Sequence, residues 1–136
     1  MRKQTKLILI GVILGILLSG IIVNAIFEDV DGPLIYEVNV LPVHPVAGDT
    51  ISVVIYCIDR SGVSGAQLAS SLDGESWTFQ DMVFYSCLCM AGGRWVAVFG
   101  PVNEGDDVQF YVTAYDNAPI QHSETTEIFS IQLTTL

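Results

Sequence analysis

The stretch Thr50-Ile-Ser-Val-Val-Ile-Tyr-Cys-Ile58 carries the clearest β-strand pattern in the chain. Side chains alternate between the two faces of a strand. One face of this stretch is entirely apolar and holds Ile51, Val53, Ile55 and Cys57. The other face is partly apolar and holds Val54, Tyr56 and Ile58. We therefore expect a buried strand with neighbours on both sides.

Weaker alternating patterns extend outward from this stretch. They predict strands at 34–40, 66–72, 94–99, 108–115 and 127–134, with one or two short strands between 76 and 89. In the first of them, one face would hold Leu34, Tyr36, Val38 and Val40. We expect Leu68 and Trp95 in the core. About seven short strands separated by turns predict an all-β, seven-stranded antiparallel sandwich of two sheets, with a small barrel as the alternative.

Residues 7–27 form an uncharged, strongly apolar run. As a helix rising about 1.5 Å per residue, it would extend roughly 30 Å, which matches the hydrocarbon core of a bilayer. Arg2, Lys3 and Lys6 precede the run and acidic residues follow it, so the C-terminal part is predicted to lie outside the cell. The predicted parts are a cytoplasmic basic tail (1–6), a transmembrane signal anchor (7–27), an acidic stalk (28–32) and an extracellular domain (33–136).

The apolar run also fits a cleavable signal peptide, since Val23-Asn24-Ala25 has small or apolar residues where a signal peptidase reads. A retained anchor is favoured because the run is longer than a usual signal-peptide core. Gly11, Gly15 and Ser19 recur at four-residue spacing, so they would share a helix face through which two helices associate in lipid. The alternative is that glycine is simply common in membrane helices.

The chain of 136 residues carries a formal net charge of −10. All fifteen acidic residues lie beyond residue 27, whereas Arg60 and Arg94 are the only two of the five basic residues there, which places the exported domain near −13. A field of this sign repels nucleic acid, so no nucleic-acid partner is expected. It is compatible with a solvated acidic surface, a bound cation or a basic partner.

Three cysteines, Cys57, Cys87 and Cys89, lie in the part expected to be outside the cell, where disulfides form. We predict a disulfide from Cys57 to Cys87 or Cys89, since either bridge would join strands distant in sequence. Cys87 and Cys89 would project from the same face of one strand, so a bridge between them would be strained. The remaining thiol would be buried or would link two chains.

Several motifs follow the prolines at 42 and 45 in a fixed order. They are Asp59-Arg-Ser-Gly-Val63, Leu68-Ala-Ser-Ser-Leu-Asp-Gly-Glu-Ser-Trp77, Trp95-Val-Ala97 and Phe110-Tyr-Val-Thr-Ala-Tyr-Asp-Asn-Ala118. In order and spacing they resemble the Ig-like, fibronectin type III-like domains of archaeal and bacterial surface proteins. The resemblance implies a β-sandwich that acts as a spacer, an adhesion module or a binder of carbohydrate or protein, without catalysis.

Two positions depart from that resemblance. Pro119 follows Ala118 where the family usually has glycine, so this turn differs. Val112 stands where antibody-type domains have their second cysteine, so an antibody-style core disulfide is absent.

The sequence contains no nucleophile elbow, phosphate loop, nucleotide-binding glycine pattern or His-Glu-x-x-His motif, so we expect no enzymatic activity. Both histidines, His44 and His122, are expected to lie exposed in loops. Calcium is the one cofactor hypothesis, because hard cations take oxygen ligands from loops. Its candidate ligands at strand ends are Asp59, Asp106, Asp107 and Asp116. Against calcium, aspartates at such positions often bond their own turn backbone.

We therefore expect a membrane-anchored extracellular module for surface structure, adhesion or interaction within an envelope complex, with an unknown protein or glycan partner. Trp77 and Trp95 could form a sugar-binding surface, although tryptophans more often fill a core. Two alternatives stay open. One is a subunit of an archaeal pilus-like filament, although Gln4-Thr-Lys6 makes a poor processing site directly before the run. The other is a secreted binding module released by cleavage after Ala25.

Overall fold

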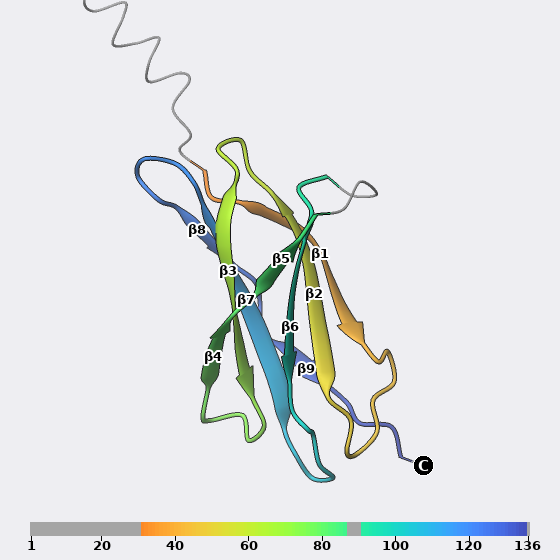
Figure 1. The fold of residues 1–136 in the computed structure, drawn as a ribbon. Coiled ribbons are helices and arrows are strands. Elements are labelled where there is room, and N and C mark those ends of the chain that lie inside the picture. The colour runs from red at the N-terminus through yellow and green to blue at the C-terminus, as the bar shows by residue number, and fades with distance from the viewer. Residues whose placement is uncertain (1–30, 87–90, 136) are drawn as a thin grey trace, which may run out of the picture. The chain divides into compact units, whose positions relative to one another are not determined.

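A computed structural model describes residues 31–86 and 91–135. Every element in this part is a β-strand, and the strands form two antiparallel sheets packed as a sandwich (Figure 1). The strands are β1 (Leu34–Leu41), β2 (Ile51–Ile58), β3 (Val63–Ser71), β4 (Thr78–Asp81), β5 (Val83–Tyr85), β6 (Arg94–Phe99), β7 (Val108–Asp116), β8 (Ser123–Thr125) and β9 (Phe129–Ile131). The predicted all-β two-sheet class is confirmed. The predicted number of seven strands is wrong, because the described residues contain nine.

Sheet A has the strand order β1-β2-β6-β5. Strand β2 lies between β1 and β6, as its two apolar faces predict. The four residues predicted to face inward are completely buried, as expected. They are Ile51, Val53, Ile55 and Cys57. Across the sheet, Ile55 pairs with Trp95 and Val53 pairs with Ala97, so the inner residues of β2 and β6 form adjacent columns of the core.

The prediction of which β1 residues face the core is wrong for the first half of the strand. The register of β1 against β2 shifts between Ile35 and Glu37, which is a β-bulge. A bulge adds one residue to a strand and thereby inverts the alternation of its side chains. Ile35 therefore packs against the core, whereas Leu34 and Tyr36 are exposed. Beyond the bulge, the predicted phase holds, because Val38 and Val40 pack against the core.

Sheet B has the order β4-β3-β7-β8, and β9 also pairs with β7. Strand β7 alternates without interruption, and its inner residues are Val108, Phe110, Val112, Ala114 and Asp116, all buried. Phe110 lies at the centre of an aromatic cluster, 6.5 Å from Phe99 and 5.1 Å from Phe129 between ring centroids. Leu68 of β3 is fully buried and Trp95 of β6 is largely buried, as predicted.

The chain changes sheets between β4 and β5. Strand β4 pairs with β3 in sheet B, and β5 pairs with β6 in sheet A. The single residue between them, Met82, is buried, and its backbone N–H donates to the Ala66 carbonyl at 2.8 Å. This bond satisfies the Met82 N–H at the point where the chain leaves sheet B, and the buried side chain adds to the core. The segment between 76 and 89 therefore forms two strands in different sheets.

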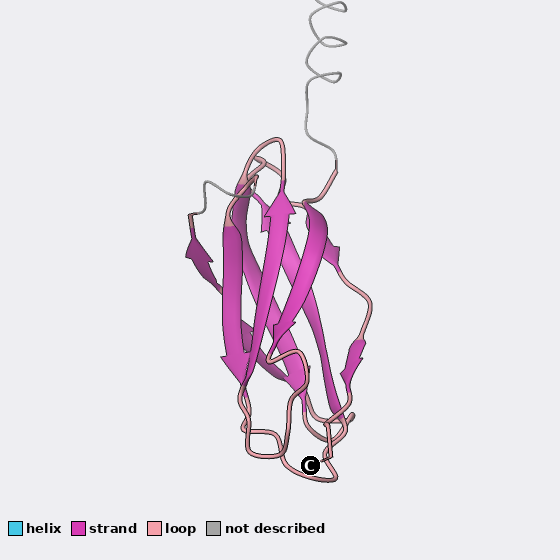
Figure 2. Ribbon diagram, turned by 90° about the vertical axis from the view of Figure 1, so that its right-hand side faces the viewer, coloured by secondary structure: helices cyan, strands magenta, loops and turns pink. Residues whose placement is uncertain are grey.

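Residues from Asp31 onward form one compact unit. The start of the described chain, drawn in orange in Figure 1, and the C-terminus lie at opposite ends of this sandwich (Figures 1 and 2). Within residues 31–86 and 91–135 there is no helix that could cross a membrane. The predicted transmembrane run, 7–27, lies outside the described residues.

Candidate functional site

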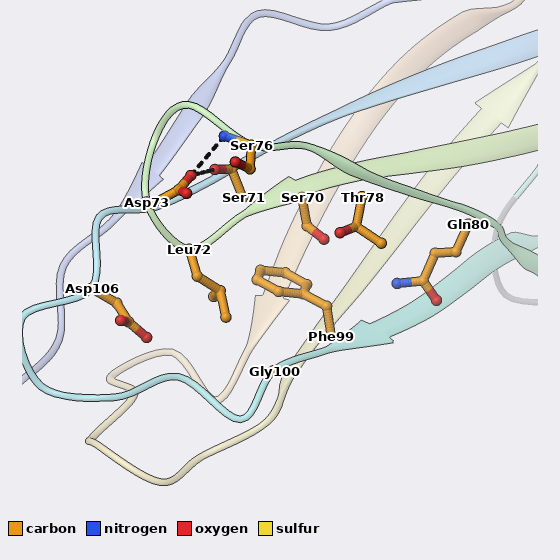
Figure 3. Close-up of a pocket in the computed structure, with 10 residues that line it drawn as sticks. All are labelled: Ser70, Ser71, Leu72, Asp73, Ser76, Thr78, Gln80, Phe99, Gly100 and Asp106. Atoms are coloured by element: carbon orange, nitrogen blue, oxygen red, sulfur yellow. Dashed lines mark hydrogen bonds between the residues drawn. The ribbon is translucent and has the colours of Figure 1, made fainter.

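A pocket of about 530 Å³ opens near the C-terminal end of the sandwich, between β4 of sheet B and the end of β6 of sheet A (Figure 3). The space exists because β5 pairs with β6 only as far as Val96, so the rest of that edge of β6 has no strand beside it. The pocket is lined by Ser70, Ser71, Leu72, Asp73, Ser76, Thr78, Gln80, Phe99, Gly100 and Asp106.

Polar groups surround the Phe99 ring in this pocket. The hydroxyls of Ser70 and Thr78 and the amide of Gln80 lie on the same side of the ring (Figure 3). Ser70 is 6% exposed. The Gln80 Nε2 donates to the Val98 carbonyl at 3.1 Å, which satisfies a backbone group at the open edge of β6. The pocket thus offers uncharged hydrogen-bonding groups beside an aromatic ring.

The Asp73 turn forms one wall of the pocket. One carboxylate oxygen of Asp73 accepts hydrogen bonds from the Ser76 N–H at 2.7 Å, the Glu75 N–H at 2.9 Å and the Ser71 hydroxyl at 3.0 Å. The backbone bonds from Ser76 and Glu75, with the Ser71 bond after them, lower the pKa of Asp73 to about 2. Asp73 therefore stays ionised at neutral pH and places a negative charge at the rim.

The four calcium candidates do not converge. Asp59 and Asp116 lie at one end of β7, because Asn117 bonds Gly62 and Ser61 of the Asp59 turn, whereas Asp106 and Asp107 precede the other end of β7. Across the described ranges, no three His, Cys, Asp or Glu side chains are grouped so as to hold a metal ion. Three of the carboxylates bond groups close in sequence: Asp59 bonds Ser61, Asp106 bonds Asn103 and Asp107 bonds Gln109.

Asp116 differs from these three because it is completely buried. Its carboxylate accepts the His122 N–H at 2.8 Å and the Ala118 N–H at 3.3 Å, and it lies 3.0 Å from His122 Nδ1. Burial by itself would raise the pKa of Asp116, but the bonds from His122 and Ala118 outweigh it and hold the pKa below its usual value. The expectation of an exposed His122 is wrong: its side chain is 29% exposed and pairs with Asp116.

The outer surface of sheet A, called the sheet A face, is mainly apolar. Its members follow from the register, since directly paired residues share a face. They are Leu34, Glu37, Asn39, Leu41, Ser52, Val54, Tyr56, Ile58, Val83, Tyr85, Arg94, Val96 and Val98. Tyr36, at the bulge, lies against Tyr56 with 6.2 Å between ring centroids, and its hydroxyl donates to the Ala91 carbonyl. Several of these apolar residues are about half exposed.

The outer surface of sheet B, called the sheet B face, combines aromatic and neutral polar side chains. Its members include Gln67, Phe79, Gln109, Tyr111, Thr113, Tyr115 and Thr125, together with the acidic Asp81, which pairs directly with Gln67. Trp77 packs beside it, with its ring 5.1 Å from that of Tyr111. Thr113 and Thr125 join their hydroxyls at 2.9 Å across two strands. Trp77 and Trp95 therefore do not form one aromatic surface, because Trp95 faces the core.

No family model matches the chain, and the search of curated proteins finds no match. The structure agrees with an Ig-like sandwich in its two antiparallel sheets.

Cys57 is buried on the inner face of β2, and burial raises the pKa of its thiol to about 11. Gly92 packs directly over the Cys57 carbonyl, so the connection between β5 and β6 meets β2 at this point. Cys87 and Cys89 lie outside the described residues, and the disulfide from Cys57 stays a prediction. Gly11, Gly15 and Ser19 also lie outside them, so the helix-association hypothesis stays a prediction as well.

Sequence reasoning missed the pocket and the Asp116–His122 pair. Ser70, Thr78 and Gln80 lie on the same side of the β3–β4 pair, but their position beside Phe99 depends on how the two sheets pack. The sequence did contain a signal that Asp116 is buried, since Asp116 continues the series of inward-facing residues of β7.

Proposed function

We propose that this protein is a non-enzymatic, membrane-anchored extracellular module of Ig-like fold, acting in surface structure, adhesion or an envelope complex. The observation that carries the proposal is a β-sandwich whose two outer faces are poor in charge, on a chain with fifteen acidic and five basic residues. Binding surfaces of proteins are depleted of charge at their centres, whereas ordinary solvated surfaces are not.

The attachment point supports the same proposal. The described chain begins at one end of the sandwich, and the pocket lies beside β4 toward the other end (Figure 1). The apolar run at 7–27 precedes the described chain and is long enough to span a bilayer as a helix. A tether at one end of a sandwich leaves its two faces and its other end accessible to partners.

A glycan is the partner that the sheet B face favours. Aromatic rings with neutral amides and hydroxyls beside them provide stacking and hydrogen bonds without charge. Tyr111, Trp77 and Gln67 supply these groups, whereas the amide nitrogen of Gln109 already donates to Asp107. The sheet A face offers mostly aliphatic contacts and suits a protein partner better.

Fractionation of cells that express the untagged chain tests the proposal. We expect a full-length mass in the membrane fraction after an alkaline wash, and digestion of the domain by protease added to intact cells. A chain that begins near Ile26 and accumulates in the medium would overturn the anchor and indicate a secreted module. A chain that begins near Leu7 would indicate the filament subunit. Digestion only after lysis would overturn the orientation.

A further inference from the structure

The sheet A face carries two charged side chains, Glu37 on β1 and Arg94 on β6, in an otherwise uncharged surface. Thirteen of the fifteen acidic residues belong to the described part, since Glu28 and Asp29 precede it, so twelve acids lie away from this face. The face is therefore locally neutral on a strongly acidic domain. It is the surface through which two like-charged copies would approach at least electrostatic cost.

The register places the two charges in one row. Glu37 pairs with Tyr56 of β2, and Tyr56 pairs with Arg94 of β6. Two strand spacings, about 10 Å, separate Glu37 from Arg94, and Tyr56 lies between them. Within residues 31–86 and 91–135 neither forms an ion pair: Glu37 accepts a hydrogen bond from Asn39, and Arg94 lies over the Tyr85 ring.

We infer that the sheet A face packs against the same face of a second copy, with a twofold axis along β2. In such a pair β2 lies over β2, and β1 of each copy lies over β6 of the other. Glu37 of each copy then faces Arg94 of the other, because both occupy the row of Tyr56. An axis perpendicular to the strands through that row would instead place Glu37 over Glu37. Charge complementarity selects the first arrangement.

The size of the face determines how strong the pair is. Four strands about 4.8 Å apart and about 26 Å long cover at most about 500 Å² on each copy. The total of roughly 1,000 Å² is at the lower end for specific interfaces. The dimer is therefore weak and exchanging, and its two ion pairs determine the orientation of the copies more than the affinity. The inference is independent of whether residues 1–25 remain on the chain.

Charge reversal in the full chain, purified in detergent micelles, tests the pairing by sedimentation equilibrium. E37R brings the new arginine against Arg94, and R94E brings the new glutamate against Glu37. We expect each single reversal to lower the association constant at least about tenfold, and the double variant E37R/R94E to recover it to within about threefold. Circular dichroism and thermal melting of all four proteins establish that they are folded.

Cross-linking gives a second readout of the axis. Outward residues of β2 lie opposite their own counterparts about 10 Å away, so S52C should cross-link between copies with a short bismaleimide above the wild-type background. T113C, on the sheet B face, should not. The proposal is overturned by a monomeric wild type, by equal association of all charge variants, or by cross-linking at T113C instead of S52C. Association lost in Gly15→Leu but unchanged by charge reversal would assign it to residues 7–27 and also overturn the proposal.

Discussion

The two faces of the sandwich enclose the same core but present different chemistry to solvent. On the sheet A face, aliphatic residues such as Val98 and Val83 are about half exposed, and their side chains cannot form hydrogen bonds. On the sheet B face, threonine and glutamine side chains alternate with aromatic rings, and Thr113 and Thr125 bond each other. A sandwich core constrains only inward positions. The outward positions are therefore free to specialise, one face for apolar contact and the other for hydrogen bonding and stacking.

The largest expected effect on stability comes from substitutions in the hydrophobic core that the two sheets share. Ile55 of sheet A and Leu68 of sheet B are both fully buried in the common core. We expect Ile55→Ala and Leu68→Ala each to lower the free energy of unfolding by about 2–5 kcal/mol, because each deletes buried methyl groups and leaves a cavity. Urea unfolding followed by tryptophan fluorescence measures this. A loss below about 1 kcal/mol in only one sheet would contradict a single shared core.

The next largest effect concerns Asp116, at the end of β7 in sheet B, and its size depends on pH. The pKa of Asp116 is lower in the folded chain than its usual value, so its ionised form adds stability above the unfolded pKa of about 3.9. That contribution is lost as the pH falls through the lowered folded pKa. We therefore expect Asp116→Asn to melt below the wild type at pH 7, with the difference shrinking as the pH falls below the unfolded pKa of about 3.9.

Thermal melting between about pH 2 and 7 checks this pH dependence. Asp81→Asn, at an exposed position of β4, is the matched control and should change the melting temperature little. A gap between Asp116→Asn and the wild type that stays constant down to the lowest pH would contradict the assigned role of the carboxylate.

A smaller effect concerns a side-chain hydrogen bond that joins the two sheets at the open edge of β6, from Gln80 to the Val98 carbonyl. Gln80→Ala removes the hydrogen bond to the Val98 carbonyl and should cost about 0.5–1.5 kcal/mol. Thr78→Ala is the matched control, since Thr78 lines the same pocket two residues earlier on β4. Chemical unfolding of both variants compares them. Equal costs would show that the bond across the edge adds nothing to stability.

The smallest expected effect on stability comes from substitutions at one exposed position on each face, and these test whether the two faces differ in self-association. Val98 and Phe79 are 52% and 55% exposed on the sheet A and sheet B faces respectively. Val98→Lys and Phe79→Lys should each change the free energy of unfolding by no more than about 0.5 kcal/mol, since both positions are surface positions. Their association should differ: Val98→Lys should reduce self-association and Phe79→Lys should leave it unchanged. Sedimentation of the two variants side by side measures this difference.

The inward-facing residues were predictable from the sequence for strands in which apolar and polar residues alternate without interruption. They were not predictable where a bulge shifts that alternation by one residue. In β2 the inner residues were identified correctly because every second residue is apolar, and the same pattern located the strand that is β7. In β1 the bulge after Ile35 displaced the predicted phase, and a one-residue bulge leaves no signal in an apolar stretch. Strand β8 was missed because its three residues, 123–125, are all polar and exposed.

The candidate sites were less predictable than the strands, since they depend on residues distant in sequence. Asp59 was correctly interpreted as a turn residue from its neighbours Ser61 and Gly62. The pocket and the charged row on sheet A require knowledge of which strands are adjacent. Glu37 and Arg94 lie in one row only because β2 places its Tyr56 between them.

The sequence by itself determined the all-β class, the central strand β2 with its inner residues, the core positions of Leu68 and Trp95 and the acidic character of the domain. These properties follow from local alternation and from composition, which need no knowledge of the partner strands. The tertiary structure alone decided the bulge in β1, the change of sheet at Met82, the pocket beside Phe99 and the burial of Asp116. Each of these depends on register, and register is set by how a whole strand packs against its neighbours.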